Sequence, residues 1–268
     1  MIAAAHALAI AFYIGAAALA AAPFARPMTA PVRGVIVLIA LGVMAHAVGL
    51  LVFARHYGQA PLTGIGPSLS FASALVALCL LAAEVLASEV SLTLVAAPLA
   101  ALIAIAAVAL GLVPGPERAG AQGIWLGSHI ALSFIGIAGF ATAAAAGVVY
   151  LVERRELKSR RFGAVFRFFP PLETLDRVNH VAAVVGWLAL TPGIVLAVTY
   201  SLAFRATNVP QLVWGLAAWV AVTALTFGRL LGGWRARRAA VAATVSFATV
   251  VVLYVAFRMV GPQPGQFL

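Results

Sequence analysis

The chain has 268 residues, of which 64% are hydrophobic and 9% are charged, and 17 Lys and Arg against 7 Asp and Glu give a net charge of +10. An ordinary soluble domain is about half apolar and about a quarter charged, so a mean hydropathy of +1.10 excludes a soluble enzyme, a disordered chain and a β-barrel porin. The composition predicts an all-α integral membrane protein whose basic residues face the lipid bilayer surface and not nucleic acid.

Eight apolar runs, separated by charged or Pro- and Gly-rich segments, predict one polytopic membrane domain over residues 1–268. The predicted spans are 2–22, 34–54, 69–87, 91–113, 123–152, 179–204, 210–231 and 239–259. Most are long enough to cross a hydrocarbon core about 30 Å thick. The fifth is too long for a simple crossing, so it is expected to tilt or to emerge as a helix into residues 153–161. The first run has no basic residue before its apolar core, so it is interpreted as a retained span and not as a cleaved signal peptide.

The basic residues divide unequally between the two sides of this bundle of eight transmembrane helices. The loops after the first, third, fifth and seventh spans carry twelve Lys and Arg residues, whereas the opposite side carries four. Because cytoplasmic loops are enriched in Lys and Arg, the N and C termini are predicted to lie on the outer (periplasmic) side.

The predicted loop 153–178 is the longest polar connection. It combines Phe residues with the basic residues Arg154, Arg155, Lys158, Arg160 and Arg161. One interpretation is a cytoplasmic docking surface for a soluble partner. The other is an interfacial segment, with Phe in lipid and Arg at the headgroups. Pro170 and Pro171 predict the start of a short helix after this loop.

Two histidines are the main candidates for a cofactor site, because ionisable residues inside a bilayer are costly. His46 and His129 are predicted at similar depths in the outer half of the membrane, and Trp125 precedes His129 by one helical turn. Imidazole ligates haem iron in apolar pockets, and an indole ring can stack on a porphyrin. The alternative is that each histidine hydrogen-bonds a neighbouring helix.

The other ionisable residues suggest weaker roles. His180, at the cytoplasmic start of the sixth span, is a separate inner candidate, whereas His6 and His56 are expected to be bystanders. Arg229 is expected to extend to the headgroups. Cys79 is the only cysteine, which excludes an internal disulfide or a CxxC site. With no nucleotide-binding Gly loop, nucleophile–base pair or paired in-membrane carboxylates, the sequence predicts no catalytic residues.

Three segments resemble the cytochrome c assembly membrane proteins of the CcsA/CcmC type, closest to the HemX/YpjD-like branch that lacks the tryptophan-rich WWD loop. They are Ser128–Lys158, Pro170–Ala197, which begins PPLETLDRVNH, and Trp219–Arg238, which ends in GRLLGGWRARR. The resemblance implies an eight-span, multi-pass protein of the bacterial cytoplasmic (inner) membrane. It also matches His129 to the external histidine at the start of the family's fifth span.

The sequence also departs from that family. Only the short link Arg205–Pro210 stands where the WWD loop would lie, and Phe227-Gly228-Arg229 lacks the histidine that often precedes this arginine. The resemblance therefore implies an accessory protein of cytochrome c or haem-protein biogenesis that binds haem b through His129 and His46. The alternative is a cofactor-free scaffold that docks another assembly factor or a soluble tetrapyrrole-pathway enzyme through loop 153–178. A transporter is disfavoured because the chain has no internal repeat.

Overall fold

The computed structural model describes residues 1–25, 31–87, 90–115, 120–159, 170–204 and 209–260. Within these ranges the chain forms helices and no strand, which confirms the predicted all-α class. The helices are α1 (Ile2–Ala25), α2 (Val32–Tyr57), α3 (Ile65–Ala87), α4 (Thr93–Ala109), α5 (Gly120–Ser159), α7 (Leu172–Phe204), α8 (Val209–Leu230) and α9 (Arg237–Val260).

Seven of these helices are long and apolar enough to cross a membrane. The other, α4, has 17 residues and is about 25 Å long, slightly shorter than a hydrocarbon core of about 30 Å. By contrast, α5 has 40 residues and is about 60 Å long, so it must tilt or project from the membrane, as predicted.

The connection between α5 and α7 differs from the prediction. Helix α5 continues through Ser159, and α7 begins at Leu172 and runs unbroken for 33 residues to Phe204. The predicted short helix after Pro171 is therefore wrong, because it is the first part of α7. Both ends of the predicted loop 153–178 are helical, because each end continues a long apolar helix that is held by packing.

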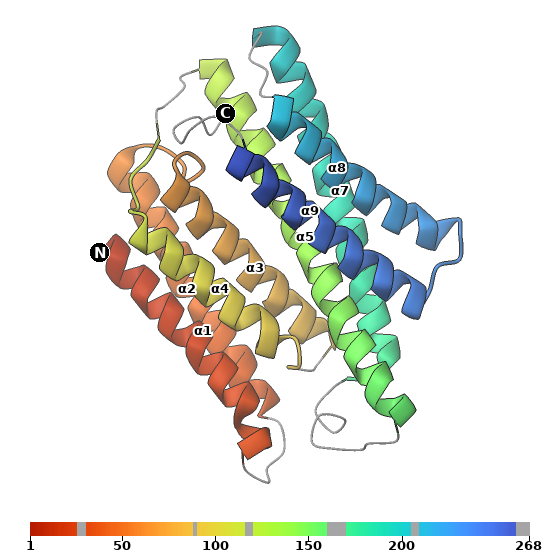
Figure 1. Cartoon of the computed structure of the whole chain (residues 1–268). Helices are drawn as coiled ribbons and strands as arrows, with labels where there is room; N and C mark the ends of the chain where they lie inside the picture. Colours follow the sequence, from red (N-terminus) through yellow and green to blue (C-terminus); the bar gives the residue numbers. More distant parts are fainter. Residues whose placement is uncertain (26–30, 88–89, 116–119, 160–169, 205–208, 261–268) are drawn as a thin grey trace.

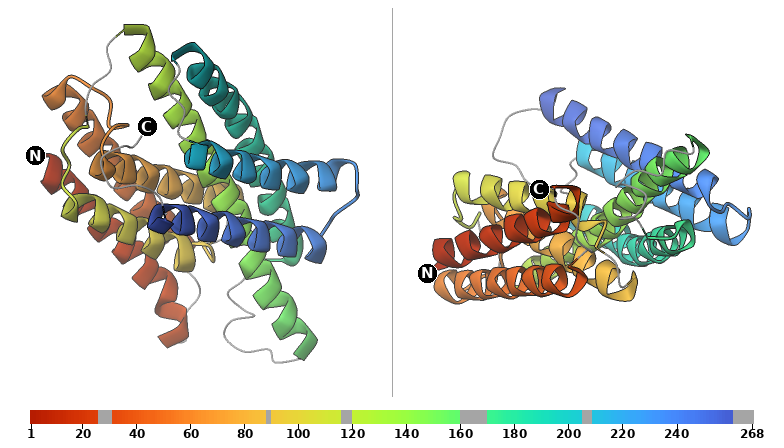
Figure 2. Two further views of the ribbon diagram at one scale, coloured as in Figure 1. Left: turned by 45° about the horizontal axis from the view of Figure 1, so that its top comes forward. Right: turned by 90° about the horizontal axis from the view of Figure 1, so that it is seen from below.

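The helices form two groups that lie side by side (Figure 1). Helices α1 to α4 pack on one another, and α5, α7, α8 and α9 form the second group. Helix α3 packs on α5 and joins the groups. Figure 2 shows α8 and α9 running side by side and crossing α5 and α7 at a steep angle.

A buried carboxylate fixes the start of α4. Glu84, on α3, is 1% exposed, and its Oε1 atom accepts hydrogen bonds from the Thr93 backbone N–H at 2.8 Å and from the Thr93 hydroxyl at 3.1 Å. An oxygen acceptor satisfies a free N–H group at a helix N-terminus. Glu84 therefore joins α3 to α4.

Helices α1 and α2 pack with a repeat of three and four residues. The buried positions are His6, Ala9, Tyr13, Ala16 and Ala20 on α1, and Val35, Ile39, Gly42, His46, Gly49 and Phe53 on α2. This 3.5-residue repeat is typical of left-handed helix packing. A Cβ atom at Gly42 would lie 2.5 Å from Tyr13 Cε1, and one at Gly49 would lie 2.8 Å from His6 Nδ1. The two glycines leave room for two rings of α1.

We predict that Gly42→Ala separates α1 from α2 and lowers the stability of the protein by about 1–3 kcal/mol, the usual cost of overpacking. Thermal unfolding in mild detergent, followed by circular dichroism, measures the effect. Gly15→Ala is the matched control, because a Cβ atom there would meet only Leu38 Cδ1, at 3.9 Å. Equal melting temperatures for the two variants would contradict this account of the helix contact.

Candidate functional site

Four buried polar side chains from α1, α2 and α3 form a continuous hydrogen-bonded chain. Tyr13 Oη lies 3.2 Å from His46 Nδ1, and His46 Nε2 lies 3.0 Å from Ser70 Oγ. Ser70 Oγ is also 2.7 Å from His6 Nε2, and His6 Nδ1 is 2.8 Å from the Ile2 carbonyl oxygen. All four side chains belong to residues that are at most 1% exposed.

The Ile2 carbonyl sets the direction of this chain, because a carbonyl oxygen only accepts. His6 Nδ1 therefore carries the hydrogen, and in a neutral ring His6 Nε2 accepts from the Ser70 hydroxyl. Ser70 Oγ then accepts from His46 Nε2–H, which leaves His46 Nδ1 to accept from the Tyr13 hydroxyl. Every nitrogen of the His6 and His46 rings thus has a hydrogen-bond partner while both rings are neutral.

His129 lies on α5 and is hydrogen-bonded to α7. Its Nδ1 atom is 2.8 Å from the Gly193 carbonyl oxygen, so Nδ1 carries the hydrogen, and it lies 3.4 Å from Ser133 Oγ. In the neutral ring, Nε2 then keeps a lone pair. Within the described part of the chain, no hydrogen bond to Nε2 is formed. A half-buried imidazole in this state can ligate a metal.

Trp125 belongs to an aromatic cluster on the same side of α5, one turn before His129. Its Nε1–H donates to the Leu196 carbonyl oxygen at 3.1 Å. The indole ring packs edge-on against Tyr200 and Phe204, with ring centroids 6.4 and 5.8 Å away. The indole is therefore anchored to α7, and stacking of Trp125 on a porphyrin stays a prediction.

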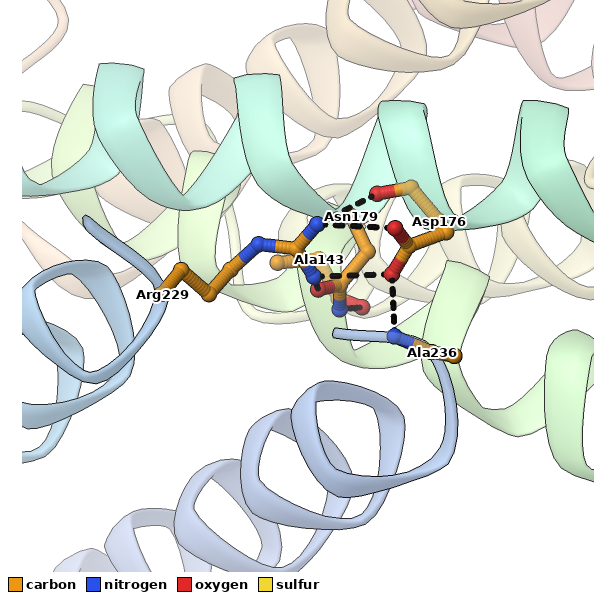
Figure 3. Close-up of polar contacts among 5 residues, drawn as sticks. All are labelled: Ala143, Asp176, Asn179, Arg229 and Ala236. Carbon is orange, nitrogen blue, oxygen red and sulfur yellow. Dashed lines mark hydrogen bonds and ion pairs between the residues drawn. The ribbon is translucent and has the colours of Figure 1, made fainter. Parts of the chain in front are cut away.

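Near the start of α7, an ion pair and the hydrogen bonds around it connect α5, α7, α8 and the residue that precedes α9 (Figure 3). Arg229, on α8, contacts both carboxylate oxygens of Asp176 at 2.9 and 3.0 Å and donates to Asn179 Oδ1 at 3.1 Å. Asp176 Oδ1 also accepts from the Ala236 N–H at the start of α9, at 3.0 Å. Asn179 Nδ2 donates to the Ala143 carbonyl oxygen on α5.

This network corrects the expectation that Arg229 extends to the headgroups. Its side chain is only 7% exposed, because Asp176 and Asn179 provide enough acceptors to hold it inside the bundle. His180, the inner candidate, lies on α7 one turn after Asp176. Its Nδ1 atom is buried and has no hydrogen-bond partner among the described residues.

The structure brings His46 together with His6, with ring centroids 4.9 Å apart. Helix α2 packs on α1 and α3, whereas α5 packs on α7, α9 and α3. His6, which was expected to be a bystander, belongs to this hydrogen-bonded chain, and so do Tyr13 and Ser70, which the sequence did not predict. A sequence pattern could have predicted this contact. Rings on α1, and Gly42, His46 and Gly49 on α2, recur at a spacing of three and four residues.

The predicted docking residues lie mainly on the projecting end of α5. Arg155 and Lys158 are exposed there, and Arg154 is half-buried. Arg160 and Arg161 lie outside the described residues. The described residues contain no group of three or more His, Cys, Asp or Glu side chains that could hold a metal ion.

Comparison with known families identifies the relatives of this arrangement. The family model described as Cytochrome C assembly protein matches residues 37–264, which include helices α3 to α9 and most of α2. The chain belongs to the cytochrome c assembly protein family. This membership confirms the resemblance at the level of the family and supports a role in cytochrome c biogenesis, whereas the HemX/YpjD-like branch stays a prediction.

Individual relatives match shorter parts of the chain. An uncharacterized 28.8 kDa protein in the nifR3-like 5′ region of Azospirillum brasilense is 31% identical over 147 residues, or 53% of this chain and 54% of the relative. The cytochrome c biogenesis protein CcsA of Synechococcus elongatus is 30% identical over 92 residues, or 33% of this chain and 28% of CcsA. The chain thus matches about half of one relative and under a third of the other. No solved structure matches.

We predict that Asp176→Asn destabilises this family member more than Glu173→Gln, an exposed change three residues earlier in α7. The variant leaves Arg229 buried without its charged partner. A fully buried pair loses about 3–5 kcal/mol in this way, and we expect a smaller loss because Asp176 is 24% exposed. Melting temperatures in detergent measure the difference, and equal values would show that the ion pair contributes little.

Proposed function

We propose that this protein binds haem b in the outer half of the bundle, with His129 as an iron ligand, and acts as an accessory protein of cytochrome c biogenesis in the bacterial cytoplasmic membrane. The observation that carries the proposal is the hydrogen bond from His129 Nδ1 to the Gly193 carbonyl. It fixes the ring orientation and the tautomer, and it leaves the Nε2 lone pair for a metal.

Aromatic and apolar residues near His129 support this proposal. Apolar helix surfaces and the Trp125, Tyr200 and Phe204 rings line the same end of α5 and α7. Bound haem would supply an iron centre whose potential depends on its axial ligand and on the polarity around it. The protein's part is to hold the imidazole on α5 through α7 and to keep water from the iron.

The two other predicted ligands have different environments. His46 has hydrogen bonds at both ring nitrogens, so it must give up a partner before it can bind iron. We therefore propose His129 as the first ligand, and the pairing of His46 with His129 stays a prediction. His180 lies beside the Asp176–Arg229 pair and stays a separate inner candidate.

We predict that the protein purified in mild detergent takes up haem and shows a Soret band, with sharp α and β bands after reduction. His129→Ala should lose most of the bound haem, because no other described group at this end of α5 offers an imidazole lone pair. His56→Ala, which changes an exposed histidine at the end of α2, is the control. No haem band in the loaded wild-type protein, or equal loading of the His129→Ala variant, would refute the proposal.

A second candidate function is docking of a soluble tetrapyrrole-pathway enzyme or another assembly factor. It is supported by the projecting end of α5, where the exposed residues Arg155 and Lys158 form a basic surface. A basic surface attracts acidic surfaces and raises the rate at which the two proteins associate.

We predict that such a partner, once purified, binds the wild-type protein and loses binding when Arg155 and Lys158 are both changed to Glu. The rate of association should fall most, and added salt should weaken wild-type binding. Arg55→Glu is the matched control, because Arg55 is exposed at the other end of the bundle. Unchanged association with the double variant would exclude this surface.

A further inference from the structure

We propose that the turn between α8 and α9 binds the phosphate group of an anionic phospholipid at the membrane surface, through the side chains of Arg235, Arg237 and Arg238. The turn has the sequence GGWRARR, and it belongs neither to the haem site proposed at His129 nor to the basic surface on α5. The three arginines lie within four consecutive residues, and all three are exposed. Within the described part of the chain, none of them forms a hydrogen bond or an ion pair.

Contacts with α7 and α8 hold the turn in one conformation. The Trp234 N–H donates to the Gly228 carbonyl oxygen at 2.9 Å, and the indole packs so closely on Gly228 that a Cβ atom there would lie 2.6 Å from Trp234 Cε3. The Ala236 N–H donates to Asp176 Oδ1 at 3.0 Å. Ala236 also has a φ of 56°, in the left-handed region that alanine rarely adopts. The backbone that carries the arginines is therefore fixed before binding, which lowers the entropic cost of binding.

The side chains beside the turn place it at the level of the lipid headgroups. Leu230 and Leu231, immediately before the turn, are 59% and 83% exposed, so they are expected to lie in lipid. Trp234 is half-buried, and tryptophan is enriched where a membrane meets water. The apolar helix α9 begins at Arg237, directly after the turn. The arginine side chains thus reach the headgroups while the two helices stay in the hydrocarbon.

The protein around the turn does not neutralise its charge. Asp176 contacts the Ala236 N–H, but this carboxylate is already paired with Arg229. A guanidinium group presents its N–H donors as a planar fork that binds two phosphate oxygens at once. A phosphodiester with one negative charge therefore complements a group of adjacent arginines that has no carboxylate partner.

The position of the turn favours a lipid over an acidic soluble protein. Arg155 and Lys158 lie on the projecting end of α5, whereas the turn lies at the edge of the bundle beside exposed apolar side chains (Figure 1). The distribution of basic residues predicts that this end of the bundle is cytoplasmic. Anionic lipids give the cytoplasmic leaflet a negative surface potential, so the proposed ligand is abundant where the arginines lie.

The test is a titration of the delipidated full chain, in mild detergent, with phosphatidylglycerol, followed by native mass spectrometry. A basic residue near an anionic surface strengthens binding by about fivefold, so changing all three arginines to Gln should weaken binding of the first lipid by about 100-fold. The matched control carries Arg55→Gln, Arg155→Gln and Lys158→Gln, which remove three charges elsewhere. The control should bind phosphatidylglycerol as the wild type does.

Two competing ligands identify what the turn recognises. Phosphatidylcholine has the phosphate but no net charge, so it should bind more weakly than phosphatidylglycerol. Inorganic phosphate and polyglutamate should not displace the lipid, because neither has acyl chains to lie along Leu230 and Leu231. Haem uptake by the triple Gln variant should equal that of the wild type, which separates this site from His129 and shows that the variant is folded.

The proposal is overturned if the triple Gln variant binds phosphatidylglycerol as tightly as the wild type does, or if the control variant loses as much binding. Equal binding of phosphatidylcholine would also overturn it, because the charge of the lipid would then have no effect. Displacement by inorganic phosphate would indicate a site for free phosphate, and displacement by polyglutamate would indicate a site for an acidic protein. Circular dichroism of each variant checks the fold independently of haem.

Discussion

A polar side chain inside a bilayer must find its hydrogen-bond partner within the protein, because lipid offers none. In this protein the resulting partnerships join side chains on different helices. Ser70 bridges His6 and His46, and so connects α3 to α1 and α2. Apolar packing alone gives little direction to helices in lipid, since the tails are as apolar as the side chains. The polar contacts therefore help to select which helices are neighbours.

Three groups of polar side chains differ in how fully their hydrogen-bonding atoms are paired: the Asp176–Arg229 pair, the His6–His46 chain and His129. The Asp176–Arg229 pair holds charges, and its surroundings satisfy both partners with Asn179 and the Ala236 N–H. The His6–His46 chain is neutral and complete, so it can rearrange only by moving hydrogens between hydroxyl and imidazole groups. His129 is incomplete within the described residues, because one nitrogen is bonded to α7 and the other is not. This difference is what separates a structural contact from a candidate ligand.

The histidine contacts divide between the two groups of helices. His129 and its aromatic neighbours lie between α5 and α7 in the second group, within the segment that the cytochrome c assembly family shares. The His6–His46 pair lies in the first group and begins before that segment. Helix α3 carries Ser70 and also packs on α5, so it contacts both groups. The protein thus combines the segment that matches the family with a hydrogen-bonded histidine, His6, on a helix that precedes this segment.

Much of the fold follows from the sequence, because a membrane span needs a long apolar run and the runs are separated by charges. The helical class and the order of the spans were predicted in this way, whereas the family was predicted from the resemblance of three segments to known proteins. The prediction was wrong at the start of α7, where the residues after Pro171 belong to one long helix and not to a separate short one. Hydropathy identifies the apolar part of a helix, and it does not show where hydrogen-bonded backbone ends.

The sequence by itself determined the chemistry that is available: few histidines, one cysteine, and basic residues concentrated on one side. It also indicated the depth of each histidine, because helical rise is constant. Only the tertiary structure decided which side chains meet. His46 faces His6 because Gly42 and Gly49 admit rings from α1, and Arg229 stays inside because Asp176 lies opposite it. Such pairings depend on how each helix is rotated about its axis and on the angle at which two helices cross. The depth of a residue along its helix specifies neither.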